Sequence, residues 1–409
     1  MLNVKTPSEV FDIIDRKFSS GCELGLDLSS LFENVEVINA VGRVLHSDIL
    51  ANEDVPGFDR STVDGYAVIA SDTFGASESI PAILNVIGDV PMGASADFSV
   101  KSGSCVSIST GGDLPDGCNA VVMVEHTEDY GDGLVGIAKP IAPGNNVIFR
   151  GDDVTRNTKI LSAGSVLTVH DVGILSALGY SDVVVCGRPI VGVISTGDEL
   201  VSPSNVPKRG QVRDVNSPML TAFINQIGGF AVDYGIVKDE EDLLRSAVLS
   251  ATNDCDVVLV SGGSSAGMRD LTAKIISDEG ELLLHGIAMK PGKPTILGTV
   301  NGKPIFGLPG HPVAAYFVTE LFVRHLLMRM TGTNLVRQTT SAQLGEAISS
   351  NHGRAEYIAV RIADGVAVPV RGKSGLIASL AGVDGYITVP RDCEGLSKGE
   401  MVEVVYFCA

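Results

Sequence analysis

Apolar and polar positions alternate most regularly in the middle of the chain, between about residue 182 and residue 331. Short runs of β-branched and long apolar residues alternate there with segments whose apolar residues recur at helical spacing. Strands that alternate with helices favour a doubly wound, mostly parallel sheet with helices on both faces. In chain order the pattern predicts a strand at 190–194, a helix at 218–227, a strand at 231–237, a helix at 240–250, strands at 257–260, 296–300 and 304–307, and a helix at 312–330.

One stretch of this region, VVLVSGGSSAGMRD at 257–270, has the pattern of a buried strand that ends in a glycine turn. Glycine pairs let successive backbone N–H groups approach a ligand closely. Such a loop lies at the carboxyl end of the sheet, where open α/β folds bind ligands. An ordinary strand-to-helix turn would have the same residues, so this stretch alone leaves both interpretations open.

On either side of this region the pattern of apolar and polar residues is different. Thr6, Pro7 and Glu9 form the start of a helix, with Thr6 as its cap, and a second helical or mixed region is expected at 35–55. A helix expected at 166–179 would rejoin these N-terminal segments. We therefore predict four domains, which are a discontinuous helical N-terminal domain (1–50 with 145–181), an inserted β-rich domain (51–144), an α/β domain (182–331) and a C-terminal β domain (332–409).

Length, composition and net charge limit which classes of molecule the protein can bind. A chain of 409 residues is too long for one core, and 44% apolar residues with 47 glycines fit a globular, turn-rich protein. The formal charge of −19 argues against nucleic acid or an anionic membrane surface as the main partner. An anionic substrate would consequently need a local basic cluster or a metal ion.

The cysteines and the N-terminal residues indicate the cellular compartment of the protein. Seven cysteines are scattered without a CxxC pair or a His/Cys spacing suited to zinc, as expected for buried thiols in a reducing environment. The first residues lack a signal-peptide pattern, and no apolar run has transmembrane length. We expect a cytoplasmic protein.

Several polar loops follow strands of the predicted sheet and should converge at one edge. Their glycine amides suit phosphate, their carboxylates suit Mg²⁺, and their lysines suit oxyanions, which together point to a nucleotide or phosphorylated ligand with magnesium. Each carboxylate taken singly also fits a helix cap or a solvated loop. The loops are Thr196-Gly197-Asp198-Glu199, Lys238-Asp239, Gly262-Gly263-Ser264-Ser265 with Asp270, Met289 to Pro294, and Gly307 to Pro312.

The run KPGKP at 290–294 holds two lysines on a stiff turn in an acidic protein. Such a pair is a candidate tetrahedral-oxyanion site, although the lysines could also be solvated. Arg354 and Ser374 are the candidates that the C-terminal domain could add. Gly292-Lys293 is not a phosphate-binding P-loop because Pro294 stands where Ser or Thr should be, and no GxGxxG follows a strand.

Taken together, these motifs resemble those of the molybdopterin molybdotransferase family, the MoeA-type proteins that include the E domains of gephyrin and of the plant enzyme. The resemblance rests on an ordered set that covers nearly the whole chain from residue 54, and no single motif decides it. The matching runs are DVPGFDRSTVDGYAV, STGGDLPDGCNAVVMVE, PGNNVIFRGDDV, VISTGDEL, RDVNSPML, SGGSSAGMRD, MKPGKP, GLPGHPV and GRAEY.

The resemblance implies insertion of molybdate into adenylylated molybdopterin, with Mg²⁺-dependent release of AMP and of molybdenum cofactor. Carried over by motif, the site residues fall into three groups. The oxyanion site would consist of Lys290, Lys293, Pro294, Arg354 and Ser374. Magnesium and the pterin phosphates would be faced by Glu199, Asp239 and Asp270, beside the loop residues Thr196, Gly197, Gly262, Gly263, Ser264 and Ser265. The β-rich domain would add Asp64 and Thr110.

The resemblance also implies a homodimer in which the β-rich domain of one subunit helps form the other's site. The molybdopterin adenylyltransferase and apo-molybdoenzymes would be its protein partners. Four positions depart from the common family pattern, namely His311 for Asn, Ala314 for Ser, Gly286 for a basic residue and Asp152 for Glu. These departures are expected to tune the affinity for the oxyanion or its choice, with tungstate as the alternative to molybdate. The competing functions are a tungstate-selective insertase, a molybdopterin adenylyltransferase and a binding scaffold of the same fold.

Overall fold

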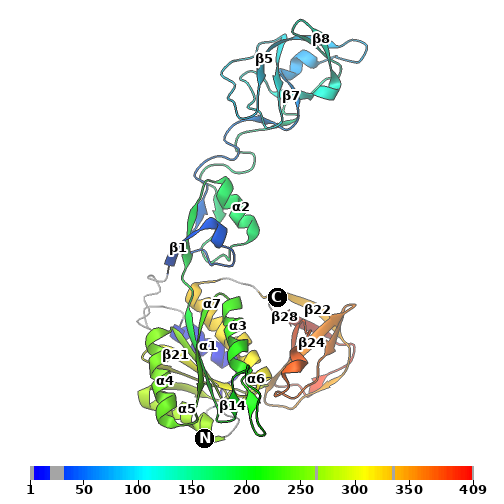
Figure 1. Ribbon diagram of the computed structural model, residues 1–409. Coiled ribbons are helices and arrows are strands. Elements are labelled where there is room, and N and C mark those ends of the chain that lie inside the picture. The colour runs from blue at the N-terminus through cyan, green and yellow to red at the C-terminus, as the bar shows by residue number, and fades with distance from the viewer. Residues whose placement is uncertain (1–3, 19–31, 263–265, 334–336, 408–409) are drawn as a thin grey trace. The chain divides into compact units, whose positions relative to one another are not determined.

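The computed structural model describes residues 4–18, 32–262, 266–333 and 337–407, with the backbone alone described at 266–270. The chain folds into two compact units (Figure 1). Unit 1 comprises Met1–Ser47, Gly164–Thr168 and Asp182–Ala409, and unit 2 comprises Asp48–Ala163 and Val169–Ser181. The finer division into four domains stays a prediction.

A six-stranded sheet forms the centre of unit 1, with the strand order β16-β13-β17-β21-β20-β18. The first four strands in this order run parallel, and β20 pairs antiparallel with both of its neighbours, β21 and β18. The expected doubly wound, mostly parallel sheet is confirmed. The strands are β13 (Ile190–Thr196), β16 (Phe230–Val237), β17 (Val257–Gly262), β18 (Gly280–His285), β20 (Ile296–Val300) and β21 (Lys303–Pro309).

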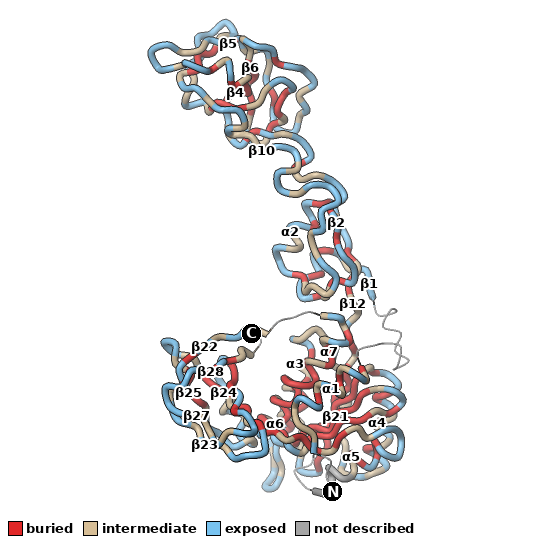
Figure 2. The backbone as a smooth tube through the Cα atoms, turned by 180° about the vertical axis from the view of Figure 1, so that it is seen from behind, coloured by how far each residue is buried: buried red, intermediate tan, exposed pale blue. Residues whose placement is uncertain are grey.

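Helices cover both faces of this sheet because its strands are apolar on both sides. In β17, Val257 and Leu259 join one core cluster, whereas Val258 and Val260 join the other. In Figure 2 the four central strands of this sheet, β13, β17, β21 and β20, are coloured mostly as buried. One face carries α1 (Pro7–Phe18), α3 (Asn216–Gln226), α6 (Pro312–Val318), a π-helical turn (Thr319–Val323) and α7 (Arg324–Thr331); the other carries α4 (Glu241–Asp254) and α5 (Ala266–Glu279).

The start of α1 is the expected capping box. The backbone N–H of Thr6 donates to Glu9 Oε2 at 2.7 Å, and the N–H of Glu9 donates to Thr6 Oγ1 at 3.3 Å. The apolar stripe of α1, Val10, Ile14 and Phe18, is buried in the α/β core rather than beside the helix expected at 166–179. That helix is α2 (Val169–Ala177) and belongs to unit 2. Helical periodicity showed that α1 has an apolar face but not which surface covers it.

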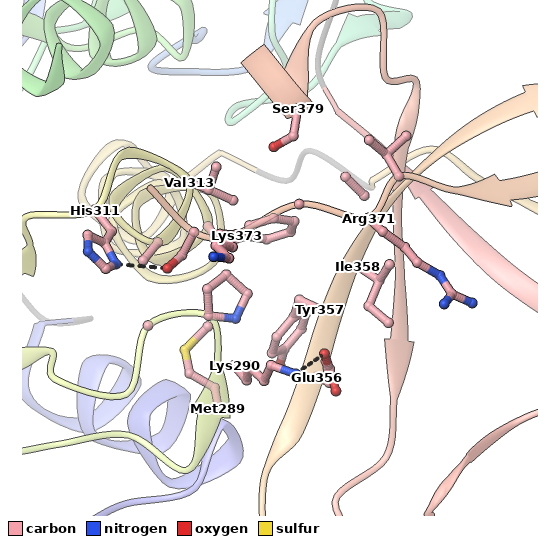
Figure 3. Close-up of a pocket in the computed structure, with 18 of the residues that line it drawn as sticks. Met289, Lys290, His311, Val313, Glu356, Tyr357, Ile358, Arg371, Lys373 and Ser379 are labelled. Carbon is pink, nitrogen blue, oxygen red and sulfur yellow. Dashed lines mark hydrogen bonds and ion pairs between the residues drawn. The ribbon is translucent and has the colours of Figure 1, made fainter. Parts of the chain in front are cut away.

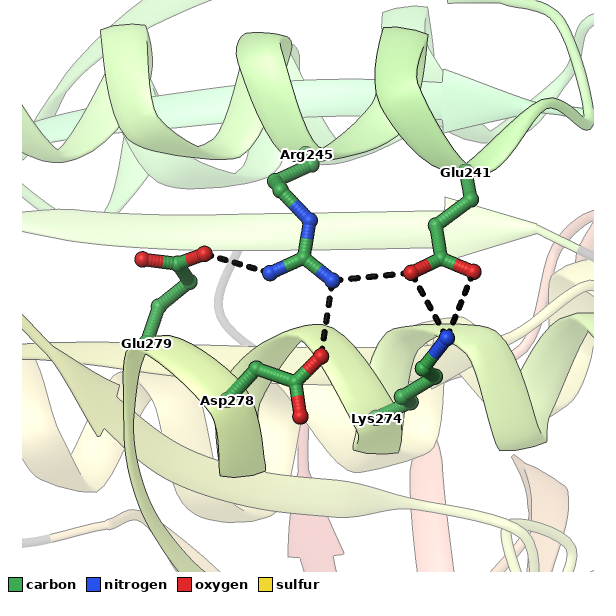
Figure 4. A network of polar contacts seen from close by, with 5 residues as sticks. All are labelled: Glu241, Arg245, Lys274, Asp278 and Glu279. Carbon is green, nitrogen blue, oxygen red and sulfur yellow. Dashed lines mark hydrogen bonds and ion pairs between the residues drawn. The ribbon is translucent and has the colours of Figure 1, made fainter.

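An exposed ion network joins α4 to α5 (Figure 4). Arg245 donates to Glu241 and Asp278, both at 2.8 Å, and it also pairs with Glu279. Lys274 contacts both oxygens of Glu241 at 2.8 Å. The hydrogen bonds that Arg245 donates to Asp278, Glu241 and Glu279 hold the pKa of its guanidinium above the usual range.

The C-terminal part of unit 1 is a closed β-barrel. Its strands pair around a ring in the order β24-β25-β22-β28-β26, and β26 pairs back to β24. Closure removes free sheet edges, apart from the start of β24, which pairs with β19 (Met289–Lys290). The strands are β22 (Thr339–Leu344), β24 (Ala355–Ala363), β25 (Val366–Pro369), β26 (Gly385–Val389) and β28 (Met401–Tyr406), with a short pair β23 (Ile348–Ser349) and β27 (Gly395–Leu396) and a 3₁₀ turn η6 (Ile377–Leu380).

A buried charged cluster ties the barrel to the α/β core. Glu320, in the π-helical turn, pairs with Arg324 at 2.8 Å, and Arg337 donates to the backbone oxygen of Glu320 at 2.7 Å. Arg337 also contacts the hydroxyl of Tyr386 on β26. Burial raises the pKa of Glu320 against the opposing effect of the two arginines. The cluster therefore fixes the barrel against the helices that cover the sheet.

Unit 2 contains the expected β-rich domain. Its six-stranded sheet has the order β7-β4-β6-β5-β9-β8, mixed in direction because β5 and β6 are parallel. The strands are β4 (Gly65–Val68), β5 (Ala82–Val90), β6 (Ser104–Ile108), β7 (Ala120–Met123), β8 (Thr127–Gly131) and β9 (Leu134–Ile137), with two short pairs, β3 (Arg60–Ser61) with β10 (Val147–Ile148) and β2 (Ile49–Leu50) with β11 (Lys159–Leu161).

The region expected to be helical or mixed at 35–55 is mixed and consists of short strands, turns and irregular segments without an α-helix. It contains the end of β1 (Phe32–Glu36), one 3₁₀ turn (Val37–Asn39) and β2. β1 pairs antiparallel with β12 (Asp182–Cys186), about 150 residues further along the chain. The local pattern could not reveal a strand whose partner is so distant and whose side chains are mostly exposed.

Candidate functional site: two cavities of unit 1

The loops that follow β13, β16, β17 and β21 begin at adjacent strand ends on the carboxyl edge of the parallel strands, whereas the predicted loop at 289–294 lies against the barrel. The ends of these strands are adjacent in the register, because Thr196 on β13 pairs with both Val237 and Gly262, and Gly262 pairs with Pro309. Across two of the loops, the Thr196 hydroxyl donates to Asp239 Oδ1 at 2.7 Å. Asp198 Oδ1 accepts the N–H of Asp239 at 3.3 Å.

A cavity of about 300 Å³, called here the polar cavity, opens at this edge. Thr196, Glu199 and Gly262 line it, and Gly197 lies in the turn that follows β13. Gly262 is required by the packing of the sheet, because a Cβ there would lie 2.1 Å from Thr196 Cγ2 and 2.5 Å from the Thr196 carbonyl oxygen. The packing of the sheet therefore accounts in part for the glycine at position 262, apart from any contact with a ligand.

Asn216 lines the polar cavity and is a residue to which sequence reasoning gave no role. Its Nδ2 donates to Ser261 Oγ at 2.8 Å and to the Gly310 carbonyl at 3.0 Å. Its Oδ1 is buried without a hydrogen-bond partner among the described residues, and the side chain is only 7% exposed. An orphaned buried acceptor is rare, and this one can accept from a water or contact an ion or ligand in the cavity. The signal available in the sequence was the run Asp214-Val215-Asn216-Ser217 before a helix, which resembles a helix cap.

The expected magnesium set is not complete in the described part of the chain. Glu199 and Asp239 lie at the same strand edge, but the side chain of Asp270 and the loop residues Gly263, Ser264 and Ser265 lie outside the described residues. Among the residues whose side chains are described, no group of three or more His, Cys, Asp or Glu is placed to hold a metal ion. The set Glu199, Asp239 and Asp270 thus stays a prediction.

A second cavity of about 800 Å³, called here the basic cavity, lies where the turn after β19 meets the barrel. Two contacts assemble it. β19 pairs with β24 through Met289–Ala355 and Lys290–Glu356, and the N–H of Val313 donates to the carbonyl of Ser374 at 3.1 Å. All five residues predicted for the oxyanion site line this cavity, namely Lys290, Lys293, Pro294, Arg354 and Ser374.

The charge of the basic cavity is opposite to that of the whole protein. Its lining includes Lys290, Lys293, Arg354, Arg371 and Lys373. Glu356, which the sequence did not single out, is the one carboxylate among the described lining residues. A local excess of positive charge in a chain of formal charge −19 suits an anionic ligand.

The cations of this cavity differ in how far they are already paired (Figure 3). Lys290 Nζ lies 2.7 Å from Glu356 Oε1, and that carboxylate is 13% exposed. Arg371 is directed away from Lys290 and Lys373, and it donates to the Ala347 carbonyl at 2.7 Å. Lys293 makes no ion pair with any described residue. Lys293 is thus the lysine of the KPGKP turn that is most available to an anion.

One wall of the basic cavity is apolar. Phe317 from α6 and Tyr357 from β24 line it, with ring centroids 6.4 Å apart. Burial raises the pKa of Tyr357 to about 12, so its hydroxyl stays neutral at physiological pH. A cavity with a basic rim and an aromatic wall can hold an organic molecule together with an anion.

His311 and Ser374 separate the two cavities. His311 lines both of them, and its Nδ1 lies 2.8 Å from Ser374 Oγ (Figure 3). The sequence singled out His311 as a departure from the family pattern and gave it no defined contact. The structure places it in direct contact with a residue of the predicted oxyanion site.

The two site residues predicted from the β-rich domain contact each other within unit 2. The backbone N–H and the hydroxyl of Thr110 donate to Asp64 Oδ1 at 2.7 Å and 2.9 Å. The backbone hydrogen bond, followed by that of the hydroxyl, lowers the pKa of Asp64. Gly65 follows Asp64 because a Cβ there would lie 1.8 Å from the Val122 carbonyl oxygen. Participation of Asp64 and Thr110 in the site stays a prediction.

The described cysteines are free thiols, and burial raises the pKa of Cys105 and of Cys118 to about 12. Cys105 and Cys118 are therefore poor nucleophiles. Within the described residues, every helix is too short or too polar to span a bilayer.

Three family profiles match consecutive parts of the chain. The MoeA N-terminal region (domain I and II) matches residues 17–179, a "Probable molybdopterin binding domain" matches residues 192–329, and the MoeA C-terminal region (domain IV) matches residues 341–407.

Individual relatives agree with these profiles. A putative molybdopterin biosynthesis protein of Methanocaldococcus jannaschii is 35% identical over 93% of this chain and 93% of its own length. The molybdopterin molybdenumtransferase of Bacillus subtilis is 32% identical over 91% of this chain and 89% of its own length.

Among solved structures, the molybdopterin biosynthesis MoeA protein of Pyrococcus horikoshii has a TM-score of 0.85 at 38% identity, with full coverage of both chains. Since relatives above 30% identity match nearly end to end, and since three profiles follow each other in order, the chain belongs to the MoeA family of molybdenum cofactor biosynthesis proteins, a family of transferases.

Proposed function

We propose that this protein inserts molybdate into adenylylated molybdopterin and releases AMP and molybdenum cofactor in a Mg²⁺-dependent reaction. The observation that carries the proposal is the basic cavity, which gathers five residues from three separate segments of the chain. An isolated tetrahedral oxyanion would not need an aromatic wall such as Phe317 and Tyr357. A metal oxyanion that joins an organic ligand would use both parts of the cavity.

The oxyanion is held in this proposal by Lys293, Ser374 and Arg354. Lys293 supplies a charge that no described residue neutralises, and Ser374 supplies a hydroxyl. Lys290 joins them once the anion competes with Glu356 for its ammonium group. Pro294 stiffens the turn that presents both lysines, which lowers the entropy lost when the anion binds.

The phosphate end of the substrate occupies the polar cavity and the strand edge around it. Backbone amides near Gly197 and Gly262 suit phosphate oxygens. The chemistry of the donor set fits magnesium, because Glu199, Asp239 and the orphaned Asn216 Oδ1 are the hard oxygens that this ion prefers. When bound, magnesium would neutralise phosphate charge during the release of AMP. Asp270 is proposed as a further ligand.

Asp64 and Thr110 are proposed to complete the site from the β-rich domain of a second subunit in a homodimer. The two hydrogen bonds that Thr110 donates to Asp64 favour its carboxylate as an anion, which is the form that accepts a hydrogen bond from an attacking water. The receiving partners would be apo-molybdoenzymes, and the donor of the substrate would be the molybdopterin adenylyltransferase.

The test is AMP release from adenylylated molybdopterin by the purified protein with Mg²⁺, with molybdate, with tungstate and with neither. Molybdate-stimulated release, with the metal recovered on the pterin, is the expected result. If tungstate alone stimulates the release, tungstate and not molybdate is the substrate. Release without any oxyanion effect would indicate a hydrolase, and no release from folded protein would indicate a scaffold.

Matched variants assign the result to the basic cavity. Lys293→Ala should shift the oxyanion stimulation to molybdate concentrations about 10- to 100-fold higher. Lys398→Ala removes an exposed lysine from a turn of the same β-barrel outside the cavity and should leave the stimulation intact. Equal losses in both variants would contradict the assignment.

A further inference from the structure

The described lining of the basic cavity includes five lysines and arginines, two of which are already engaged. Lys290 pairs with Glu356 at 2.7 Å, and Arg371 is directed away and donates to the Ala347 carbonyl. The other three make no ion pair or side-chain hydrogen bond with any described residue, and they are Lys293, Arg354 and Lys373. Lys373 is the one of these three that has no role in the proposed oxyanion site.

The position of Lys373 is set by backbone hydrogen bonds around it. Lys373 lies in the loop after β25, and its carbonyl accepts the N–H of Leu376 at 2.8 Å. The carbonyl of the next residue, Ser374, accepts the N–H of Val313 at 3.1 Å, which ties the loop to the first turn of α6. In Figure 3 the Lys373 side chain extends toward the other lining residues. Lys373 is thus held at the cavity beside the hydroxyl that the proposed site already uses.

No carboxylate of the described cavity lining is available to neutralise Lys373. Glu356 is the only one there, and it is held by Lys290 at 2.7 Å and by the Ser350 hydroxyl at 2.8 Å. An exposed lysine without a partner among the described residues contributes little to the stability of the fold. Its positive charge is therefore available to a ligand, and its removal should be felt in binding and not in folding.

The net charge of the ligand is the property to which a further cation is most sensitive. The Coulomb energy between two charges is proportional to their product. At the same place in the cavity, the Lys373 ammonium group therefore stabilises a dianion twice as strongly as a monoanion of the same shape. A hydrogen bond from the neutral Ser374 hydroxyl distinguishes the two charges less sharply.

We propose that Lys373 is a specificity-determining residue, whose ammonium group makes the basic cavity select doubly charged tetrahedral oxyanions over singly charged ones of the same size. This role rests on the proposed function, since Lys373 acts at the oxyanion site proposed there. The favoured ligands are tetrahedral dianions such as molybdate, tungstate and sulfate. The disfavoured ligands are tetrahedral monoanions such as perrhenate.

The test compares molybdate with perrhenate by calorimetric titration of the full-length protein at low ionic strength, where charge effects are least screened. Both anions are tetrahedral and similar in size, but molybdate carries two negative charges and perrhenate one. Lys373→Gln should weaken molybdate binding about tenfold and perrhenate binding about threefold, because half the free energy corresponds to the square root of the fold-change. Sulfate, a smaller dianion, should lose as much affinity as molybdate.

Two further variants separate the charge of Lys373 from other effects. Lys373→Arg keeps the positive charge and should retain most of the preference for molybdate over perrhenate. Lys398→Gln removes the same charge from an exposed turn of the barrel outside the cavity, and it should leave both affinities unchanged. Urea denaturation should give the wild-type free energy of unfolding for all three variants, because neither lysine pairs with a described residue.

The results separate the role of Lys373 from the oxyanion site itself. If the wild-type protein binds none of the three anions, the oxyanion site of the proposed function is wrong, and the role of Lys373 with it. If molybdate binds but Lys373→Gln keeps the wild-type ratio of the molybdate and perrhenate affinities, the role of Lys373 is overturned while the site survives. An equal change of this ratio in Lys398→Gln would assign the selectivity to the net charge of the protein and would also overturn it.

Discussion

The two cavities of unit 1 share the wall at His311 but are built in different ways. The polar cavity is formed by strand ends, glycines and hydroxyls that lie next to each other because neighbouring strands are in register. The basic cavity is formed by side chains from the turn after β19, the start of β24 and the loop after β25, which only a tertiary contact brings together. The comparison teaches that backbone geometry governs one half of the site and charge the other. Substitutions should therefore affect the two halves differently.

The largest expected effect is on the backbone-governed half. Gly262→Ala would place a Cβ 2.1 Å from Thr196 Cγ2 and 2.5 Å from the Thr196 carbonyl, between two buried strands. Overpacking of this kind should lower the free energy of unfolding by about 3 kcal/mol. Urea denaturation measures it. Gly375→Ala is the control, since its Cβ would meet only His311 Cδ2 at 3.8 Å, and a similar loss there would contradict the packing argument.

A smaller effect, confined to turnover, is expected from the carboxylates of the strand edge. Asp239→Asn keeps an oxygen that can accept the Thr196 hydroxyl but removes the charge. The rate of AMP release should fall about 100-fold, as for loss of a group that stabilises charge developing in the reaction. Molybdate affinity, measured by calorimetry in the same sample, should be unchanged. A parallel loss of oxyanion affinity would show that the two cavities are not separable.

In the basic cavity, the two lysines of the KPGKP turn should not be equivalent. Lys293→Ala should weaken molybdate binding about 10- to 100-fold, the value of one charge-assisted hydrogen bond. Lys290→Ala should weaken molybdate binding several-fold less than Lys293→Ala does. Lys290 already pairs with Glu356 at 2.7 Å, and that carboxylate partly neutralises its charge. Equal losses of molybdate affinity in the two variants would contradict this prediction, because they would mean that breaking the Lys290–Glu356 ion pair requires no free energy.

The smallest effect should be a gain. Glu356→Gln removes the one carboxylate among the described residues that line the basic cavity, and it frees Lys290 for the anion. Because Lys290 is well exposed, the pair is worth about 0.2–1 kcal/mol, and molybdate affinity should rise about two- to fivefold. Ser350 Oγ, which donates to Glu356 at 2.8 Å, can donate equally to a glutamine oxygen. Weaker binding in this variant would make Glu356 part of the anion site.

Sequence patterns determined the elements that depend on local periodicity and the edge where they meet. The apolar run before Gly262 predicted a buried strand, and the rule for parallel sheets then predicted that Thr196, Asp239 and Gly262 would converge. The capping box at Thr6 and Glu9 could also be read directly, because all of its atoms lie within one turn. These features follow from spacing over a few residues.

Only the tertiary structure decided which distant segments share a surface. It placed α1 in the α/β core, paired β1 with β12, and brought Glu356 and His311 against the predicted oxyanion residues. Neither Glu356 nor His311 has a local signature, since a carboxylate in a strand and a histidine before a helix are ordinary at the level of pattern. The physical reason is that charge pairing and hydrogen-bond direction depend on distances of a few ångströms between segments far apart in the chain. Such distances are set only when the barrel closes and β19 pairs with its open edge.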